Sequence, residues 1–276
     1  MALSATLAAR SQSFADERTG FFPTDILAVG NSYVNAGFSV FSEHSDYVRI
    51  TKRGKIDPGS YESHVASWAM TLRHGLFENT DVTVNLPYHP VYEFTTANAS
   101  GAPQKVDAQK GWGSPLFRIA YGLVGDASKP YSVTVALTAV ADMMGNSTGS
   151  TTPAINLGYK LNDTSRLYTM ADLYYPTRTG GSRQQTVRFG GQYDFSTALT
   201  LDLSARYTHF NTTDSNISYH NSGLELDLFY KITDNFYLSS AIANEWRPDR
   251  GNKNRLSVYK GSADLRTYAL GLRYLF

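Results

Sequence analysis

The chain ends in the stretch YALGLRYLF, residues 268–276, and the alternation in this stretch decides the fold. In an extended strand, successive side chains point to opposite faces. One face of this stretch carries only large apolar side chains, whereas the other carries small residues and one cation. The apolar face comprises Tyr268, Leu270, Leu272, Tyr274 and Phe276, and the opposite face Ala269, Gly271 and Arg273. This pattern is typical of a strand with lipid on one side and water on the other.

The same alternation recurs along the chain from Tyr33 onward. Together with the final stretch, it predicts about twelve strands of roughly ten residues, a length that crosses a bilayer at a tilt. The other strands are predicted at residues 33–40, 66–72, 82–88, 115–123, 131–139, 155–161, 167–175, 187–195, 199–207, 224–232 and 236–242.

Short turns and long polar connections alternate between the predicted strands. This sorting predicts a barrel threaded from one side of a membrane. The short turns include Glu78-Asn79, Asn162-Asp163 and Thr233-Asp234, and the long connections are residues 41–63, 89–112, 143–151, 176–185, 211–221 and 247–263. We therefore predict an all-β fold, a single transmembrane antiparallel up-and-down β-barrel over residues 31–276, with short periplasmic turns and longer extracellular loops.

Aromatic side chains on the apolar faces form two rows, as amphipathic rings do at the two headgroup boundaries of a membrane. The row near the short turns comprises Tyr121, Tyr131, Tyr159, Phe195, Tyr230, Phe236, Tyr274 and Phe276. The row near the long connections comprises Trp68, Tyr88, Phe117, Tyr175, Tyr207, Trp246 and Tyr268. A final strand that ends on an aromatic residue is typical of bacterial outer-membrane barrels. We therefore expect a Gram-negative outer membrane, contact with membrane lipid and lipopolysaccharide, and engagement of the barrel assembly machinery through Phe276.

The composition argues against several other classes of protein. Charged residues make up 18% of the chain, the mean hydropathy is −0.31, and no apolar run reaches the about 18 residues of a transmembrane helix. A formal net charge of +1 predicts no nucleic-acid partner. Cysteine is absent, the histidines lack metal-ligand spacing, and no cofactor fingerprint is present, so we expect no metal, no cofactor and no catalysis. No signal peptide is visible, so we expect that a cleaved leader precedes Met1.

Residues 1–30 are polar and have no sustained periodicity, but they carry Phe14, Phe21 and Phe22. These aromatic rings would be poorly hidden on a free chain end. We therefore predict that residues 1–30 fold into the barrel lumen as a plug, and the alternative is a loose periplasmic tail.

The faces opposite the apolar ones carry acids and bases in nearly equal number. Buried charges persist only when they are paired or hydrated, so this balance favours a narrow lumen crossed by ion pairs. A small channel stays open as an alternative, and so does a purely stabilising role for each charge. The predicted lumen-lining residues are Arg73, Asp81, Arg118, Lys160, Asp172, Arg188, Asp202, Arg206, Glu225, Asp227 and Arg273.

Several stretches carry a resemblance to a known family. They are Leu72-Arg73-His74-Gly75-Leu76, Val84-Asn85-Leu86-Pro87-Tyr88, Gly111-Trp112-Gly113-Ser114-Pro115-Leu116-Phe117 and the units Tyr193-Asp194-Phe195 and Tyr230-Lys231-Ile232-Thr233. The chain resembles the outer-membrane barrels associated with meta-pathway phenol degradation, in which an acidic residue often stands at the position of Ser114. The resemblance implies passive uptake of small hydrophobic or aromatic compounds, with the N-terminal segment plugging the lumen.

Other functions remain open at this point. An outer-membrane lipid hydrolase would need a nucleophile and a base, and His220 and Ser222 share one strand face with His209 or Asn211 nearby. A narrow general diffusion pore for small hydrophilic solutes and a structural or adhesive barrel are further alternatives. A lateral exit through the wall is also possible if Pro115 or Gly190-Gly191 weakens a strand ladder.

Overall fold

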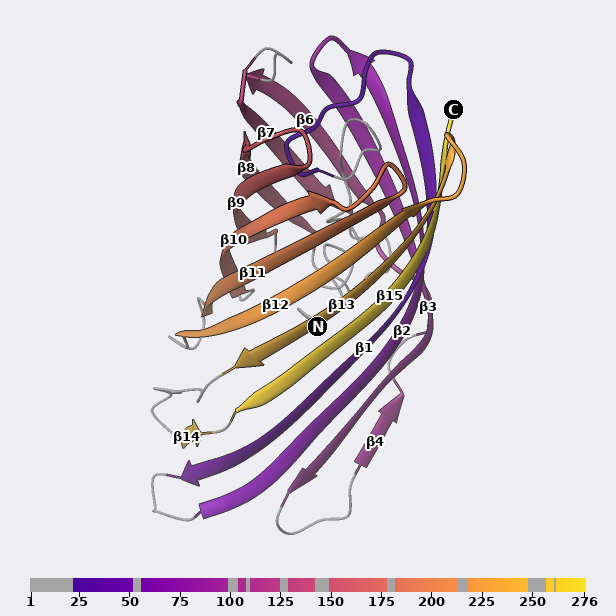
Figure 1. Ribbon diagram of the computed structural model, residues 1–276. Helices are drawn as coiled ribbons and strands as arrows, with labels where there is room; N and C mark the ends of the chain where they lie inside the picture. The colour runs from indigo at the N-terminus through magenta and orange to yellow at the C-terminus, as the bar shows by residue number, and fades with distance from the viewer. Residues whose placement is uncertain are drawn as a thin grey trace.

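The computed structural model describes residues 22–51, 56–98, 104–107, 110–124, 129–141, 149–177, 182–212, 218–247, 257–260 and 262–276. These residues form one closed antiparallel barrel in which twelve long strands follow one another around the ring (Figure 1). The predicted all-β up-and-down barrel of about twelve strands is therefore confirmed. Within these ranges, no helix is long and apolar enough to cross a membrane.

The twelve long strands differ in length around the ring, and three short strands lie beside them. The long strands are β1 (Ser32–Thr51), β2 (Ile56–Phe77), β3 (Thr80–Asn98), β6 (Leu116–Val124), β7 (Tyr131–Val140), β8 (Ser150–Lys160), β9 (Ser165–Pro176), β10 (Ser182–Asp194), β11 (Leu199–Thr212), β12 (Ser218–Lys231), β13 (Phe236–Arg247) and β15 (Ala263–Leu275). The short strands are β4 (Gln104–Asp107), β5 (Gly111–Trp112) and β14 (Ser257–Lys260).

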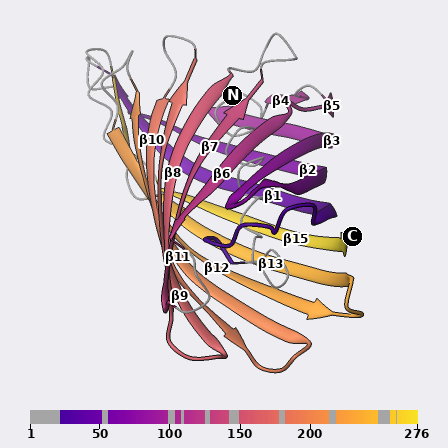
Figure 2. The ribbon, with the colours of Figure 1, turned by 90° about the horizontal axis from the view of Figure 1, so that it is seen from above.

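The ring closes between the first strand and the last. β1 pairs with β2 on one side and with β15 on the other, from Tyr33 opposite Leu275 to Ser45 opposite Ala263 (Figure 2). At the end of this seam, Ser32 and Phe276 exchange two backbone hydrogen bonds of 2.9 Å each. The terminal aromatic residue thus completes the ladder directly beside the point where the chain enters its first strand.

Side chains alternate between the two faces of the wall as the sequence predicts. In β15, Leu270 and Leu272 are 59% and 46% exposed on the outer face, whereas Arg273 on the inner face is 2% exposed. Neighbouring strands place aromatic residues opposite one another on the outside, for example Tyr131 opposite Tyr159 and Trp68 opposite Tyr88. An apolar outer face and a polar inner face are what a barrel in lipid requires.

Two long connections predicted from the sequence are wrong. β1 and β2 pair continuously up to Ile50 opposite Ile56, so most of residues 41–63 is strand. β3 likewise continues to Asn98, and β4 and β5 lie within the region predicted as a loop over residues 89–112. Past the aromatic row near the long connections, the outer face of these strands is polar as well. The contrast between an apolar and a polar face, which marks a strand in lipid, therefore disappears there, although the strands stay paired.

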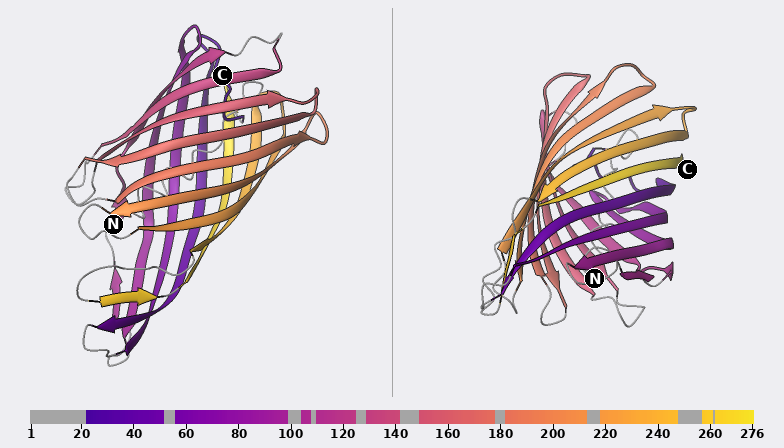
Figure 3. Two further views of the ribbon diagram at one scale, coloured as in Figure 1. Left: turned by 90° about the vertical axis from the view of Figure 1, so that its left-hand side faces the viewer. Right: turned by 90° about the horizontal axis from the view of Figure 1, so that it is seen from below.

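The end of the barrel opposite the C-terminus is oblique, because neighbouring strands end at different heights. β1, β2, β3 and β4 extend furthest from the end that holds the C-terminus (Figures 1 and 3). Where the strands are shorter, β6 begins only at Leu116. It pairs with β3 over a short stretch, from Thr80 opposite Tyr121 to Asn85 opposite Leu116. Gly190 and Gly191 lie in unbroken ladders with β9 and β11, so the expected weakening at these two residues is wrong. Pro115 directly precedes β6, where the short ladder with β3 ends.

Candidate functional site: the segment that crosses the lumen at the short-turn end

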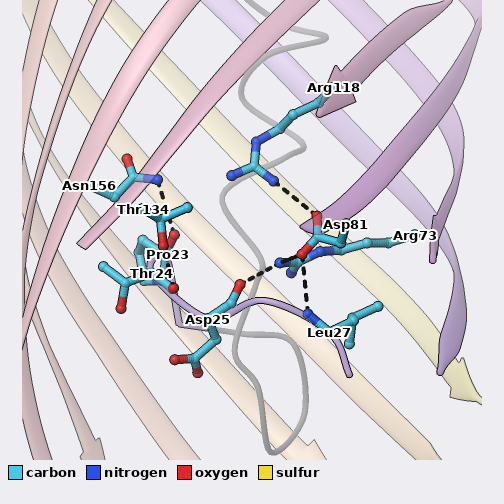
Figure 4. A network of polar contacts seen from close by, with 9 residues as sticks. All are labelled: Pro23, Thr24, Asp25, Leu27, Arg73, Asp81, Arg118, Thr134 and Asn156. Carbon is cyan, nitrogen blue, oxygen red and sulfur yellow. Dashed lines mark hydrogen bonds and ion pairs between the residues drawn. The ribbon is translucent and has the colours of Figure 1, made fainter. Parts of the chain in front are cut away.

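Residues 22–30 run across the interior of the barrel at the end of the short turns. Inward-facing side chains from opposite walls hold the backbone of this segment (Figure 4). The Thr134 hydroxyl donates to the carbonyl oxygen of Thr24 at 2.5 Å, and the Asn156 amide donates to that of Pro23 at 3.1 Å. From the other side, the Arg73 guanidinium donates to the carbonyl oxygen of Asp25. Because the backbone carbonyls of the segment are bound by the wall, the segment is fixed in the lumen rather than resting in it.

Asp81 is the centre of this network. Its Oδ2 atom accepts from the Arg73 guanidinium at 2.5 Å and from the backbone N–H of Leu27 at 3.2 Å. Arg118 approaches Oδ1 of the same carboxylate at 3.7 Å. The side chains of Arg73 and Asp81 are 1% and 0% exposed. A charge pair buried this completely is stable only while both partners are present, so Asp81 couples the wall to the segment.

The start of the segment is held by charge and by ring contacts. The Asp25 carboxylate pairs with Arg166 at 3.2 Å, and the same guanidinium lies 4.4 Å from the centre of the Phe22 ring. Phe22 also meets Tyr168 edge to face, with centroids 5.6 Å apart. Tyr168 is itself fixed, because its hydroxyl donates to Asp202 at 2.8 Å. Cation–π and edge-to-face contacts add to the burial of Phe22, which is 2% exposed.

Three wall glycines make room for this arrangement. A Cβ atom at Gly75 would overlap the backbone carbonyl of Ala28, and one at Gly158 would lie 2.8 Å from the Phe22 ring. At Gly190 a Cβ atom would overlap the ring of Tyr168, which lies across this position. Side chains at these positions would therefore displace the segment or the ring that supports it.

The predicted lumen-lining residues fall into two groups and two single residues. Arg73, Asp81 and Arg118 belong to the network around residues 22–30. Asp172, Arg188, Asp202, Arg206, Glu225 and Asp227 lie on the inward faces of β9 to β12, where Arg188 pairs with Glu225 and Arg206 with Glu245. Arg273 lies over the ring of Tyr33 at 4.1 Å. Lys160 lies apart at the end of β8, where it pairs at 2.7 Å with Asp163 in the adjoining turn.

Sequence reasoning did not single out several residues that hold the segment. Asp25, Thr134, Asn156, Arg166 and Tyr168 come from four parts of the chain and meet only in the closed barrel. The alternation of apolar and polar residues predicts that each wall residue faces the lumen. It does not predict which residue each one contacts. Of the residues predicted to plug the lumen, Phe22 contacts Tyr168 and Arg166, whereas Phe14 and Phe21 lie outside the described residues.

The other half of the lumen carries an apolar cluster on its inner face. Phe41, Val65, Ala263 and Leu265 pack together at 1–4% exposure, and Tyr92 packs against them. Beside this cluster Arg247 pairs with Glu43 at 2.7 Å and lies 5.2 Å from the centre of the Tyr219 ring. Apolar side chains on an inward face are unusual in a lumen that is otherwise polar, so this half differs in chemistry from the end that residues 22–30 cross.

The residues considered for a hydrolase lie on the outer face of the wall. His220 stacks on Tyr207 with centroids 5.4 Å apart, and Ser222 follows on the same face of β12. His209 lies directly opposite His220 in the neighbouring strand. Among the described residues, no group of three or more His, Cys, Asp or Glu side chains could hold a metal ion.

The structure is a closed antiparallel β-barrel with an apolar outer face, and residues 22–30 cross its lumen. Several solved structures share this fold at low sequence identity, and two of them are described here. An outer-membrane channel from Pseudomonas putida F1 is 11% identical with a TM-score of 0.60, and the match covers 92% of this chain and 98% of that one. The CymD monoaromatic hydrocarbon channel is 8% identical with a TM-score of 0.50, covering 90% and 89%. No protein-family description and no curated protein sequence matches the chain.

Proposed function

We propose that this protein is an outer-membrane channel for the passive uptake of small hydrophobic or aromatic compounds, with residues 1–30 acting as a plug. The proposal keeps the family resemblance of the sequence, to the barrels associated with meta-pathway phenol degradation. It also includes a Gram-negative outer membrane, with lipopolysaccharide around the outer aromatic row and Phe276 as the signal for barrel assembly.

The observation that carries the proposal is the bonded segment across the periplasmic end. Thr134, Asn156, Arg73 and Asp81 hold residues 23–27 from both sides of the lumen. An open pore for small hydrophilic solutes needs a continuous path of water, and a fixed segment works against such a path. A gated route for a sparse, apolar solute is compatible with this segment.

The apolar cluster in the far half supports the class of solute. Phe41, Val65, Leu265 and Tyr92 present aliphatic and aromatic surface on inward faces. Apolar and aromatic linings are the usual surface of a site for a small apolar molecule. Two of the structures that share the fold are described as channels, and CymD is described as a channel for monoaromatic hydrocarbons.

Single-channel conductance in a planar bilayer tests the plug. We expect the full chain to conduct very little and a chain lacking residues 1–30 to conduct far more. A large conductance that truncation leaves unchanged would mean an open diffusion pore for hydrophilic solutes, and the proposed function would be wrong.

Uptake of radiolabelled toluene by cells tests the solute class. Cells with the chain in their outer membrane should take up toluene faster than cells without it. The full-length variant Lys160→Gln is the control for an altered chain, and it should take up toluene as the unaltered chain does because Lys160 lies at the rim. Equal uptake with and without the chain would contradict the hydrophobic solute, whatever the conductance.

A further inference from the structure

Four neighbouring strands of the wall carry only small side chains in the middle of their inward faces. The strands β13, β15, β1 and β2 lie side by side (Figure 1). Their registers place in one row Ser239, Gly271, Gly37 and Ala69. The next row towards the far half, from Ala241 to Ser67, carries only alanine and serine. Side chains fill the interior of a narrow barrel, so two rows without long side chains leave a recess in the wall.

The recess has room for a small ring. Because strands lie about 4.8 Å apart and rise about 3.3 Å per residue, four strands and two rows measure about 14 Å by about 7 Å between their Cα atoms. Gly37, Ala69 and Ala269 are only half-buried although they face the lumen, whereas Tyr33 and Phe41 on either side of Gly37 in β1 are 3% and 1% exposed. The recess and the part of the open lumen directly in front of it together hold about 380 Å³ of empty space.

Asn35 is the polar side chain at the edge of the recess nearer to residues 22–30. It lines the recess and is 8% exposed. Its Oδ1 atom lies 3.3 Å from the place of a Cβ atom on Gly271, and its Nδ2 atom lies 3.8 Å from that of a Cβ atom on Gly37. Neither atom makes a hydrogen bond with another described residue. Buried polar groups nearly always have partners, so an amide beside empty space points to an occupant that both donates and accepts.

The other surroundings of the recess fix the rest of that occupant's chemistry. Towards the far half, Phe41 and Val65 follow on β1 and β2 and begin the apolar cluster. None of the described residues that line the recess is charged. Arg273 is opposite Asn35, but its guanidinium lies over the ring of Tyr33, one row further from the recess. A charged ligand would lose hydration here without gaining an opposite charge, whereas an uncharged ring finds apolar surface.

We propose that this recess binds a flat, uncharged ring that bears one group with both a donor and an acceptor, a carboxamide or an alcohol. The ring lies on the small residues of the four strands and extends towards Phe41, and the polar group pairs with the Asn35 amide. A carboxamide fits best, because its N–H donates to Oδ1 while its carbonyl oxygen accepts from Nδ2. This inference rests on the proposed function and narrows its solute class to rings with such a group.

Equilibrium dialysis of radiolabelled benzamide against the full-length protein in detergent tests the recess, with the same detergent alone as the blank. We expect saturable binding of benzamide and, by competition, several-fold weaker binding of benzoate and of toluene. Gly37→Leu should abolish benzamide binding, because a Cβ atom at Gly37 meets nothing closer than 3.5 Å and the added side chain fills the recess. Ala36→Leu, on the exposed outer face of the same strand, is the matched control and should bind benzamide as the unaltered chain does.

Asn35→Leu separates the polar contact from the shape of the recess. It removes the donor and the acceptor, so benzamide binding should fall by roughly two- to tenfold, since a neutral hydrogen bond is worth about 0.5–1.5 kcal/mol and each 1.4 kcal/mol is tenfold. Toluene binding should not fall, because toluene makes no hydrogen bond with Asn35. Gel mobility of the unheated protein shows whether each variant has formed its barrel.

Four results would overturn the proposal. They are no saturable binding of benzamide, which would leave water alone in the recess, benzoate binding as tight as that of benzamide, equal benzamide binding by Gly37→Leu and Ala36→Leu, and unchanged benzamide binding by Asn35→Leu. Toluene uptake by cells without benzamide binding would leave the proposed function intact and remove this site alone.

Discussion

The two halves of the lumen are built from the same alternating wall, yet they hold their contents by different chemistry. At the periplasmic end, charged and amide side chains reach across the lumen to a segment of the chain itself. In the far half, Phe41, Val65 and Leu265 pack against one another within the wall. The difference teaches that directional polar contacts hold the segment in the lumen, whereas the far half offers non-directional apolar surface.

Removal of the Asp81 carboxylate should have the largest effect. Asp81→Ala leaves Arg73 buried without its anion and takes the acceptor from Leu27, so we expect a loss of about 3–5 kcal/mol in the free energy of unfolding. Urea unfolding followed by gel mobility measures this loss, and bilayer recordings should show increased conductance. Thr83→Val is the control on the same strand face, and an equal loss in both variants would contradict a special role for Asp81.

Truncation of Phe22 should have a smaller effect that is confined to the end that residues 22–30 cross. Phe22→Ala removes the ring between Tyr168 and Arg166 and should cost about 3 kcal/mol if the segment stays docked, or less if it detaches. Conductance should rise, and a spin label at Val29 should become more mobile. An unchanged label spectrum together with unchanged conductance would mean that the ring does not hold the segment.

Breaking the ion pair of the far half sharpens the contrast between the two ends. Glu43→Gln leaves Arg247 without its carboxylate next to the apolar cluster, and we expect a cost of roughly 1–3 kcal/mol. Because this pair has no contact with residues 22–30 among the described residues, conductance should stay low. A rise in conductance equal to that of Asp81→Ala would show that the two ends are not independent.

The exposed turn at Thr233-Asp234 should show the smallest effect of all. A hydrogen bond from Lys231 lowers the pKa of the Asp234 carboxyl, so the contribution of this pair is present above the unfolded pKa of aspartate and fades as the pH falls through the lowered value. Asp234→Asn should therefore leave unfolding at pH 7 nearly unchanged, since exposed pairs contribute little. A clear loss of stability at pH 7 would contradict this ranking.

The barrel could be predicted from the sequence because lipid imposes a contrast between the two faces of each strand. The contrast ends where β1 and β2 pass the aromatic row near the long connections. The strand residues from Phe41 to Thr51 and from Ile56 to Ser63 were therefore assigned to a connection. The inner position of Arg73 and Asp81 was predictable for the same reason. Their attachment to Leu27 was not, because that contact joins residues 54 positions apart across the lumen, and local periodicity carries no signal of such pairing.

The wall contacts of residues 22–30 also allow one particular order of assembly. Arg73, Asp81, Thr134, Asn156 and Arg166 all belong to strands from β2 to β9, which precede the second half of the wall in the sequence. The segment can therefore dock on a curved, open sheet while β10 to β15 are still to be added. In that order, the pairing of Ser32 with Phe276 at the two free edges would enclose the segment in the closing ring rather than thread it into a finished one.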